Sequence, residues 1–431
     1  MTRVSFTTGL VLAVAALPPA VAEPAPPPAT VESAKTLMLS GRTQEARSML
    51  QELASRNPAS NDVAFLLGLL AIDAADYRQA IAHFRSILVR EPTALRVRLE
   101  LARAFYMSHD YENAFRQFQF ARAGKLPPGV SASIDRFVAA IRREKRWSYN
   151  FSFAVAPDTN INNGTSSREA VIFGLPFELS EETRKRSGTG LAVAASSEFA
   201  PRISEKMRLR MGGAVERREY KGKAFDDMTI AGYVGPRILL DRWDLSLLGT
   251  GFQRWFGGRR LNQGFGGKIE ASRAGTRTSI SLGLSALEVR YPDFPLQNGR
   301  ALTAWGGAVR ALTPASAVNG RIGLSRRTAR IPELASWSAW AAAGYYRDLP
   351  GGFSVYVEPS YGYTRYDAAD PFFGLRRKDR LLELQLALLN RRIIMSRFTP
   401  RIALTIARRR STIDLYDYSQ RRIEVGVTSA F

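Results

Sequence analysis

Residues 381–390 read LLELQLALLN, and apolar side chains occupy every second position along them. Residues 401–407 (RIALTIA) and 279–285 (SISLGLS) alternate in the same way. Successive side chains of a strand point to opposite faces, so each stretch predicts a β-strand with one apolar face and one small or polar face. A soluble β-sandwich would show the same alternation. Repetition in strands of about 10 residues without any long apolar run favours a transmembrane β-barrel.

The barrel is expected to span residues 147–431 and to close on itself, because lipid offers no partner for a free backbone edge. Short and long connections alternate between its strands, as two different rims would require, and one of the long connections is expected at residues 257–261. The chain ends on an alternating strand with Phe431 last, an ending typical of the C-terminal assembly signal of bacterial outer-membrane proteins. Fourteen strands are predicted, an even number, and they begin near Ser148, Ser187, Met207, Met228, Trp243, Asn262, Arg277, Ala301, Ala317, Ser336, Phe353, Arg380, Arg397 and Gln420.

Residues 1–22 have the features of a secretory signal peptide, with Arg3 before an apolar core and a small-x-small cleavage site at residues 20–22. Residues 23–29 (EPAPPPA) form a Pro-rich spacer. We find no second apolar run long enough for a transmembrane helix. An exported chain with amphipathic strands is expected in the outer membrane of a Gram-negative bacterium.

The chain has 61 Lys and Arg against 39 Asp and Glu, a net charge of +22, and no cysteine. Such a balance is compatible with nucleic acid or with an anionic membrane surface. The arginines are spread through strands, turns and loops, which favours the rims and lumen of a barrel over a nucleic-acid site. The absence of cysteine excludes a disulfide framework, a thiolate metal site and lipidation of this chain itself.

Residues 30–146 change to helical periodicity and repeat with a spacing of 34 residues, seen at Ala46, Ala80 and Ala114. That period and those small residues are typical of tetratricopeptide (TPR) repeats, in which small side chains let paired helices approach. A periplasmic TPR-like domain is therefore expected. Its basic end, residues 142–146, should reach the membrane, with Trp147 and Tyr149 in an aromatic girdle. The predicted helices are 31–40, 43–56, 61–74, 77–90, 95–107, 111–122 and 131–145.

The first helices of the repeats would line a partner-binding groove. An alternative is that the apolar members of this set only build the helical core. The predicted groove residues are Phe65, Leu69, Ile72, Leu99, Arg103 and Tyr106.

The chemical inventory argues against an enzyme. The two histidines, His83 and His109, both lie in the helical region, so the barrel lacks the residues for Ser-His or Cys-His catalysis. We expect no catalytic residue, no metal site and no cofactor. The loop carboxylates at positions 293, 367 and 370 are expected to be solvated, with calcium binding as the alternative.

The stretch Pro157-Asp158-Thr159-Asn160-Ile161-Asn162 just after the first strand resembles a signature of the surface lipoprotein assembly modulator (Slam) family, and so do residues 411–418 and 422–431 at the end of the chain. The resemblance covers nearly the whole mature chain. It implies an α + β multidomain protein, a TPR domain followed by a 14-stranded antiparallel transmembrane barrel. The motif residues carried over are Pro157, Asp158, Asn160 and Asn162.

The function that this implies is delivery of lipoproteins or related secreted cargo to the cell surface. The expected partners are the cargo protein, a periplasmic chaperone, the barrel-assembly machinery and outer-membrane lipid, and no nucleic acid. Two alternatives remain open, a passive solute porin with an accessory helical domain and a scaffold that recruits periplasmic partners. The motif turn after the first strand either shapes its loop or supports a seam through which cargo passes.

Overall fold

The computed structural model describes residues 30–393 and 398–429. The predicted signal peptide, the Pro-rich spacer and the assembly signal at Phe431 lie outside these residues. Contacts divide the chain into two compact units, with the boundary between Val63 and Ala64 inside α3. The change from helix to strand comes later, between Glu144 and Trp147.

Seven α-helices are present among the described residues, and their bounds agree closely with the predicted ones. The largest difference is the last helix, which begins three positions earlier than expected because Pro128 takes its first turn, where a missing N–H costs nothing. The helices are α1 (Val31–Leu39), α2 (Thr43–Arg56), α3 (Asn61–Asp73), α4 (Tyr77–Arg90), α5 (Leu95–Met107), α6 (Tyr111–Arg122) and α7 (Pro128–Glu144).

The first unit consists of the α1–α2 pair and the start of α3. Thr30 caps α1, since its hydroxyl oxygen accepts a hydrogen bond from the backbone N–H of Ser33 at 3.0 Å. Ala34, Ala46 and Leu50 are fully buried. The small residues of the 34-residue pattern thus lie where helices approach each other.

In the second unit, α4 to α7 share one apolar core with the rest of α3. Phe84, Ile87, Leu101 and Phe118 are among its buried members. Gly68 of α3 faces the ring of Phe84, and a Cβ atom at this position would lie 2.5 Å from Cε1 of that ring. The close approach of α3 and α4 therefore depends on the missing side chain.

Replacement of Gly68 by alanine is expected to destabilise the helical part by about 1–3 kcal/mol, because the added methyl group overpacks the contact with Phe84. Gly129 of α7 is the matched control, since a Cβ atom there meets nothing within 4 Å. Gly129→Ala should leave stability unchanged or raise it by about 1 kcal/mol or less. Urea unfolding of the full chain in micelles, followed by helical circular dichroism, measures both. Equal midpoints for Gly68→Ala and the parent would contradict the packing argument.

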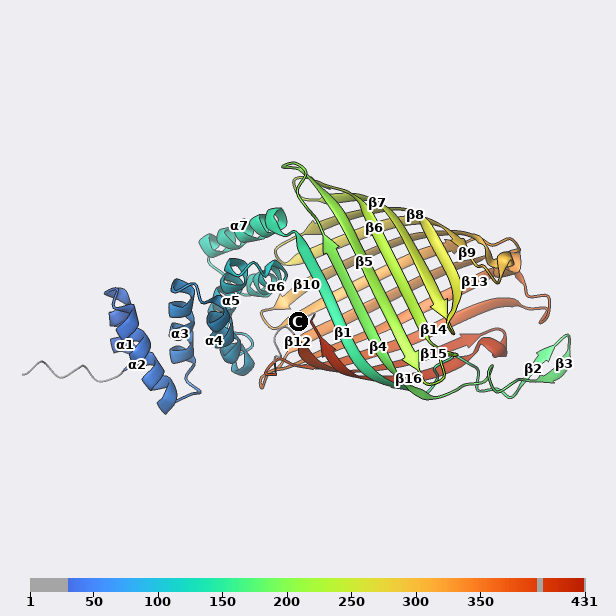
Figure 1. Ribbon diagram of the computed structural model, residues 1–431, viewed down its shortest axis with the longest axis horizontal. Coiled ribbons are helices and arrows are strands. Elements are labelled where there is room, and N and C mark those ends of the chain that lie inside the picture. Colours follow the sequence, from blue (N-terminus) through green and yellow to red (C-terminus); the bar gives the residue numbers. More distant parts are fainter. Residues whose placement is uncertain (1–29, 394–397, 430–431) are drawn as a thin grey trace, which may run out of the picture. The chain divides into compact units, whose positions relative to one another are not determined.

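Fourteen antiparallel strands form a closed barrel, in the order β1, β16, β15 and back through the chain to β4 (Figure 1). Most predicted strand starts lie within two residues of the observed ones, and the largest difference is four residues at β14. The barrel strands are β1 (Trp147–Asp158), β4 (Gly188–Phe199), β5 (Met207–Tyr220), β6 (Asp227–Leu239), β7 (Asp244–Phe256), β8 (Arg259–Ala274), β9 (Thr278–Arg290), β10 (Gly299–Thr313), β11 (Ser316–Arg327), β12 (Ser336–Asp348), β13 (Phe353–Ala369), β14 (Arg376–Asn390), β15 (Thr399–Ser411) and β16 (Tyr418–Thr428).

The two faces of the barrel wall differ as the alternation predicts. On β1, Phe153 and Val155 are exposed, whereas Ala154 and Ala156, which alternate with them, are buried. Exposed apolar side chains recur in the same alternating register on the other strands, for example Leu282 and Leu284 on β9. The outer surface is therefore apolar, as a wall that faces hydrocarbon must be.

We call the rim where α7 enters β1 the proximal rim; it carries connections 200–206, 240–243, 275–277, 314–315 and 349–352, and also the β14–β15 connection, of which residues 391–393 and 398 are described. The opposite, distal rim carries connections 159–187, 221–226, 257–258, 291–298, 328–335, 370–375 and 412–417. The predicted long connection at residues 257–261 is wrong. Gly257 and Gly258 both have positive φ and join β7 to β8 in a tight two-residue turn.

The longest distal connection contains a small hairpin that the sequence analysis missed. Its strands are β2 (Glu169–Ile172) and β3 (Leu175–Glu178), and they form a separate two-stranded sheet. The hairpin projects from the distal rim (Figure 1). Phe173 at its tip contacts Phe372 of the β13–β14 connection, with ring centroids 5.6 Å apart.

Candidate functional site: the helix-covered rim, the lumen and the barrel seam

A buried arginine ties α5 to the proximal rim. The guanidinium group of Arg98 donates a hydrogen bond of 2.7 Å to the carboxylate of Asp348, which ends β12. Their side chains are 1% and 4% exposed. Arg98 also donates to the carbonyl oxygen of Pro92 at 2.8 and 3.0 Å and to Gln117 at 2.7 Å. Burial lowers the pKa of Arg98, and the Asp348 carboxylate opposes that shift.

Asp348 has partners on the barrel as well. Ser354 donates a hydrogen bond of 2.8 Å to the carboxylate, and the Tyr346 hydroxyl donates to the same oxygen. The Nε atom of Arg391 lies 3.3 Å from it. The carboxylate is therefore shared between one arginine of a helix and one arginine of the barrel.

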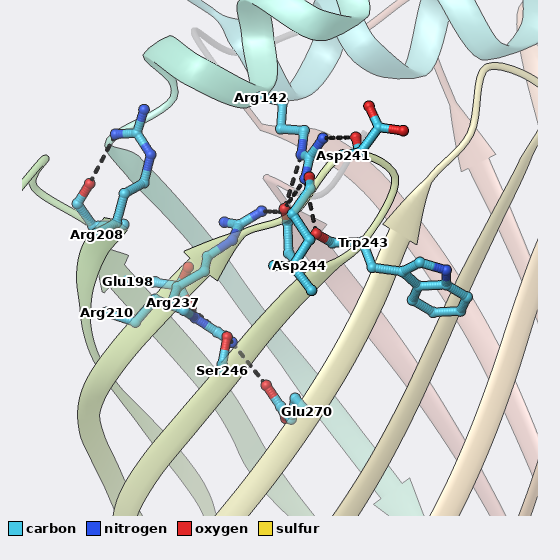
Figure 2. Close-up of polar contacts among 12 residues, drawn as sticks. Arg142, Glu198, Arg208, Arg210, Arg237, Asp241, Trp243, Asp244, Ser246 and Glu270 are labelled. Atoms are coloured by element: carbon cyan, nitrogen blue, oxygen red, sulfur yellow. Dashed lines mark hydrogen bonds and ion pairs between the residues drawn. The ribbon is translucent and has the colours of Figure 1, made fainter. Parts of the chain in front are cut away.

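A second arginine, Arg142 in the last turn of α7, is bound at the β6–β7 connection (Figure 2). Its Nε atom donates to Asp244 at 2.8 Å, and other nitrogens donate to the carbonyl oxygens of Asp241 and Trp243 at 2.8 and 2.9 Å. Arg237 of β6 pairs with the other oxygen of Asp244. Arg142 thus binds the barrel rim, and the prediction that this basic helix end meets the membrane stays a prediction.

Two further contacts complete the attachment of the helices. Gln119 of α6 donates hydrogen bonds to Ser279 at 2.7 Å and to the carbonyl oxygen of Gly275 at 3.3 Å. The backbone N–H of Gly351 donates to the carbonyl oxygen of Val89 at 2.8 Å. Helices α4 to α7 are thus each bonded to a proximal connection or to the strand end beside it.

Below this attachment, charged groups continue along the inner face of the wall. Arg210 of β5 donates hydrogen bonds to Glu198 at 2.7 and 3.0 Å, to Ser246 at 3.0 Å and to Glu270 at 2.8 Å (Figure 2). These partners come from β4, β7 and β8. Lys268 of β8 adds a second cation, 2.8 Å from Glu270. Each carboxylate in this cluster is paired, which is what desolvated charges require.

The barrel interior also contains a cavity of about 480 Å³. Residues of β1 and β4 to β7 line one part of it, and residues of β14 to β16 line another. The ionisable groups on its wall are mostly arginines. They are Arg217, Arg218, Arg254, Arg401 and Arg422, with Glu216, Asp227 and Glu424. Such an interior can accommodate a polar or anionic segment.

Among the described residues no cluster of potential metal ligands occurs. In the same part of the chain, no helix has the length and apolar character of a membrane-spanning helix. What the geometry offers is a hollow, charged barrel with helices bonded to one rim.

Comparison with known proteins identifies the family. Residues 147–431, the whole predicted barrel, match the family described as surface lipoprotein assembly modifier. The chain belongs to the surface lipoprotein assembly modifier family. This description names assembly and no reaction, in agreement with the expectation that the chain is not an enzyme. As a member of this family the chain is an outer-membrane protein.

Relatives in the family resemble the chain beyond the barrel. Surface lipoprotein assembly modifier 1 of Neisseria meningitidis serogroup B is 24% identical over 380 residues, which are 84% of this chain and 75% of the relative. A Haemophilus influenzae family member is 22% identical over 415 residues, or 92% of this chain and 82% of the relative. A solved anion-selective porin from Comamonas acidovorans is 10% identical and covers 65% of this chain and 99% of its own, with a TM-score of 0.36.

In this family member the predicted groove residues do not form one uniform surface. Ile72 is 6% exposed and belongs to the helical core. Phe65, Leu69, Leu99 and Tyr106 are half-buried against that core, and only Arg103 is well exposed. Tyr106 also donates to Glu144 of α7 at 3.3 Å, and burial together with that carboxylate raises the pKa of its hydroxyl. The groove stays a prediction, with Ile72 assigned to the core.

The family motif lies where the barrel closes. Pro157 and Asp158 are the last residues of β1, not part of the turn after it. Gln420 of β16 donates to the carboxylate of Asp158 at 2.8 Å, and Asn160 donates to the carbonyl oxygen of Ser419 at 3.0 Å. Both motif side chains are buried, at 4% and 0% exposure.

Asn162 has a separate role in the same connection. Its amide donates to the carbonyl oxygens of Glu182 and Arg184 at 2.9 and 2.7 Å, and its oxygen accepts from the N–H of Arg186 at 3.1 Å. These bonds hold the two ends of the 159–187 connection together. Asn162 therefore shapes the connection, whereas Asp158 and Asn160 bind β16.

Several functional residues were missed by the sequence analysis: Arg98, Asp348, Asp244, Gln420 and Arg422. One signal was available for Arg98. It occupies a position between Val97 and Leu101 on the buried side of α5, and a buried arginine requires an acidic or carbonyl partner. The identity of that partner, 250 positions away, could not be inferred from helical periodicity.

Proposed function

We propose that this protein delivers lipidated proteins across the outer membrane to the cell surface. The observation that carries the proposal is the family match over residues 147–431, since the relatives are named for the assembly of surface lipoproteins. The hollow, charged interior supports it, because a polypeptide in transit is polar along its backbone and needs polar surroundings inside a bilayer.

The helices would act on the periplasmic side. An even number of strands returns both barrel ends to one rim, and the helices are bonded to that rim. Cargo or a periplasmic chaperone would bind the exposed surface of α3 and α5 around Phe65, Leu99 and Arg103. The barrel-assembly machinery would insert the barrel, with Phe431 as part of the signal. No catalytic step is required.

A passive porin is the second candidate, and the arginine-rich interior cavity favours it. A porin of this kind would conduct anions steadily and would need no lipoprotein partner. The two functions differ in whether lipidated proteins change their location when the chain is removed.

Deletion of the gene in its own host should remove from the cell surface lipoproteins that the parent strain displays there. Cells are grown with alkyne-palmitate, intact cells are treated with proteinase K, and the labelled proteins are separated on gels. At least one labelled band should be degraded in the parent, protected in the deletion strain and degraded again after plasmid complementation. A periplasmic marker protein must remain intact in all three strains.

Identical protease sensitivity of every labelled band in parent and deletion strains would overturn the proposal. In that case, steady conductance of the purified protein in planar bilayers would establish the porin alternative.

A further inference from the structure

Within the residues that the structure describes, the first and last strands of the barrel share fewer register pairs than any other two neighbouring barrel strands, and the N–H of Ser429 adds one bond to the carbonyl oxygen of Phe151 at 2.9 Å. Among the described residues β1 and β16 share five register pairs, from Ser152↔Thr428 to Val155↔Val425 and then Asp158↔Arg422. The β6–β7 and β12–β13 ladders also skip two positions, but each keeps eleven pairs. On its other side β1 pairs with β4 at twelve consecutive positions, so the weakness lies on the β16 side.

The interruption has an identifiable cause. The N–H of Thr159 donates to the carbonyl oxygen of Arg421 at 3.0 Å. Hydrogen-bonded positions alternate along an antiparallel ladder, so Pro157, two residues earlier, occupies the position whose N–H would reach Ile423. Proline has no N–H, and a ladder bond is lost at that point. Ala156 and Pro157 indeed have no register partner on β16, although all four positions concerned are described.

Small residues of β1 line the inner side of this seam, whereas β16 contributes Gly426 together with the charged Glu424 and Arg422. Ser152, Ala154 and Ala156 alternate along β1, and Gly426 faces them from β16. A Cβ atom at Gly426 would lie 1.9 Å from the carbonyl oxygen of Phe153, so the two backbones approach closely without side chains between them. Ser152, Ala154 and Gly426 also line the interior cavity.

Above the break, side chains hold the seam shut. We call this set the latch: Asp158, Asn160, Ser419, Gln420 and Arg422. Gln420 donates to Asp158 at 2.8 Å and to the carbonyl oxygen of Asn160 at 3.0 Å, and Arg422 lies 3.9 Å from Asp158. Side-chain bonds of this kind contribute about 1 kcal/mol each and can be broken one at a time, unlike a continuous backbone ladder.

We infer that the β1–β16 seam is a lateral gate, closed by the latch, through which the acyl chains of a lipidated cargo pass between the lumen and the bilayer. This inference rests on the proposed function. Acyl chains cannot stay in a lumen lined by arginine, whereas the polypeptide can, so a lipidated cargo needs an opening in the wall. The seam offers the break, the small side chains and the adjoining cavity that such an opening requires.

A disulfide across the seam tests the gate. The chain has no native cysteine, so within the chain the two introduced cysteines can pair only with each other. Ser152→Cys with Thr428→Cys joins register partners of β1 and β16, and Ser325→Cys with Ser338→Cys joins register partners of β11 and β12 as the matched control. Register partners in a ladder lie within the distance that a disulfide spans. A second lock, Val155→Cys with Val425→Cys, guards against a defect specific to the first pair.

Each variant is expressed in the host, and alkyne-palmitate-labelled proteins are tested with protease on intact cells before and after treatment with reductant. Oxidised seam variants should lose lipoprotein exposure and regain it on reduction, whereas the control pair should display at the parent level in both states. Heat-modifiable gel mobility must show folded barrels throughout. Full display by a quantitatively oxidised seam variant would overturn the gate while leaving the proposed function intact. Loss of display in both seam locks even when reduced, with normal display by the parent, would also count against the gate mechanism.

Hydrogen exchange of the purified protein provides a readout that needs no cargo. Amides of β16 at residues 421–425 should exchange faster than those of β11, in which every residue from 316 to 327 has a register partner on both sides. Pro157→Val, which restores an N–H to the seam, should slow exchange there. Equal exchange in β16 and β11, unchanged in the variant, would show that the seam does not open.

Discussion

Replacement of Asp348 by alanine is expected to destabilise the helical part by about 3–5 kcal/mol, because it leaves the buried Arg98 without a counter-ion. The Arg98 side chain is 1% exposed and cannot reach water without moving α5. Without the carboxylate, no negative charge offsets the free-energy cost of burying the Arg98 guanidinium group. Arg98→Met should cost less, since Asp348 keeps Arg391 at 3.3 Å and the hydroxyl groups of Tyr346 and Ser354.

Urea unfolding of the full chain in micelles, followed by helical circular dichroism, measures both variants and their combination. The double variant should lose less free energy of unfolding than the two single variants lose together. In the double variant neither Arg98 nor Asp348 is left as a buried charge without its partner. Asp241→Ala is the matched control at the same rim. Its side chain is 96% exposed, and Arg142 binds only its backbone oxygen. A loss in the control equal to that in Asp348→Ala would contradict the buried-pair argument.

Removal of residues 30–146 is expected to abolish lipoprotein display while the barrel still inserts. The deletion takes Arg98 and Arg142 away from Asp348 and Asp244. Each of these carboxylates retains a barrel arginine, Arg391 or Arg237, so no unpaired charge is left at the rim. Heat-modifiable mobility should therefore remain at the level of the full chain.

A shorter deletion separates the two compact units. Removal of residues 30–60 takes out α1 and α2 and leaves α3 complete, together with all the predicted groove residues. We expect this variant to retain display, measured by protease sensitivity of alkyne-palmitate-labelled proteins on intact cells. Equal display by the full chain and by the 30–146 deletion would show that the helices are not needed for transport.

Local sequence patterns predicted most of this fold, because residues close together in the sequence determine where each helix and strand forms. Alternation of apolar and polar residues located the strands, and Ala46, Ala80 and Ala114 located the helix contacts. The β2–β3 hairpin was missed because Leu175-Pro176 breaks the alternation over only four residues. The length of the connection at Gly257-Gly258 was overestimated, because glycine occurs in long loops and in tight turns alike.

The sites were less predictable because they join distant parts of the chain. The motif at Pro157 was recognised by resemblance, but its partners Gln420 and Arg422 are brought to it only by closure of the barrel. The Arg98–Asp348 pair likewise depends on how α5 meets the β12–β13 connection. No periodicity encodes contacts between residues that belong to different elements.

The closing contact between Phe151 and Ser429 also sets the order in which the barrel can form. The two residues are 278 positions apart, whereas the other barrel ladders join strands that follow one another along the chain. Nearby segments pair faster than distant ones, so hairpins would assemble into a curved sheet before the ends meet. The helical region leaves the ribosome first, but the barrel cannot complete its ring until the final strand has arrived. Until then both strand edges remain open, and a molecule delayed at this stage would be the form most prone to pair with another chain.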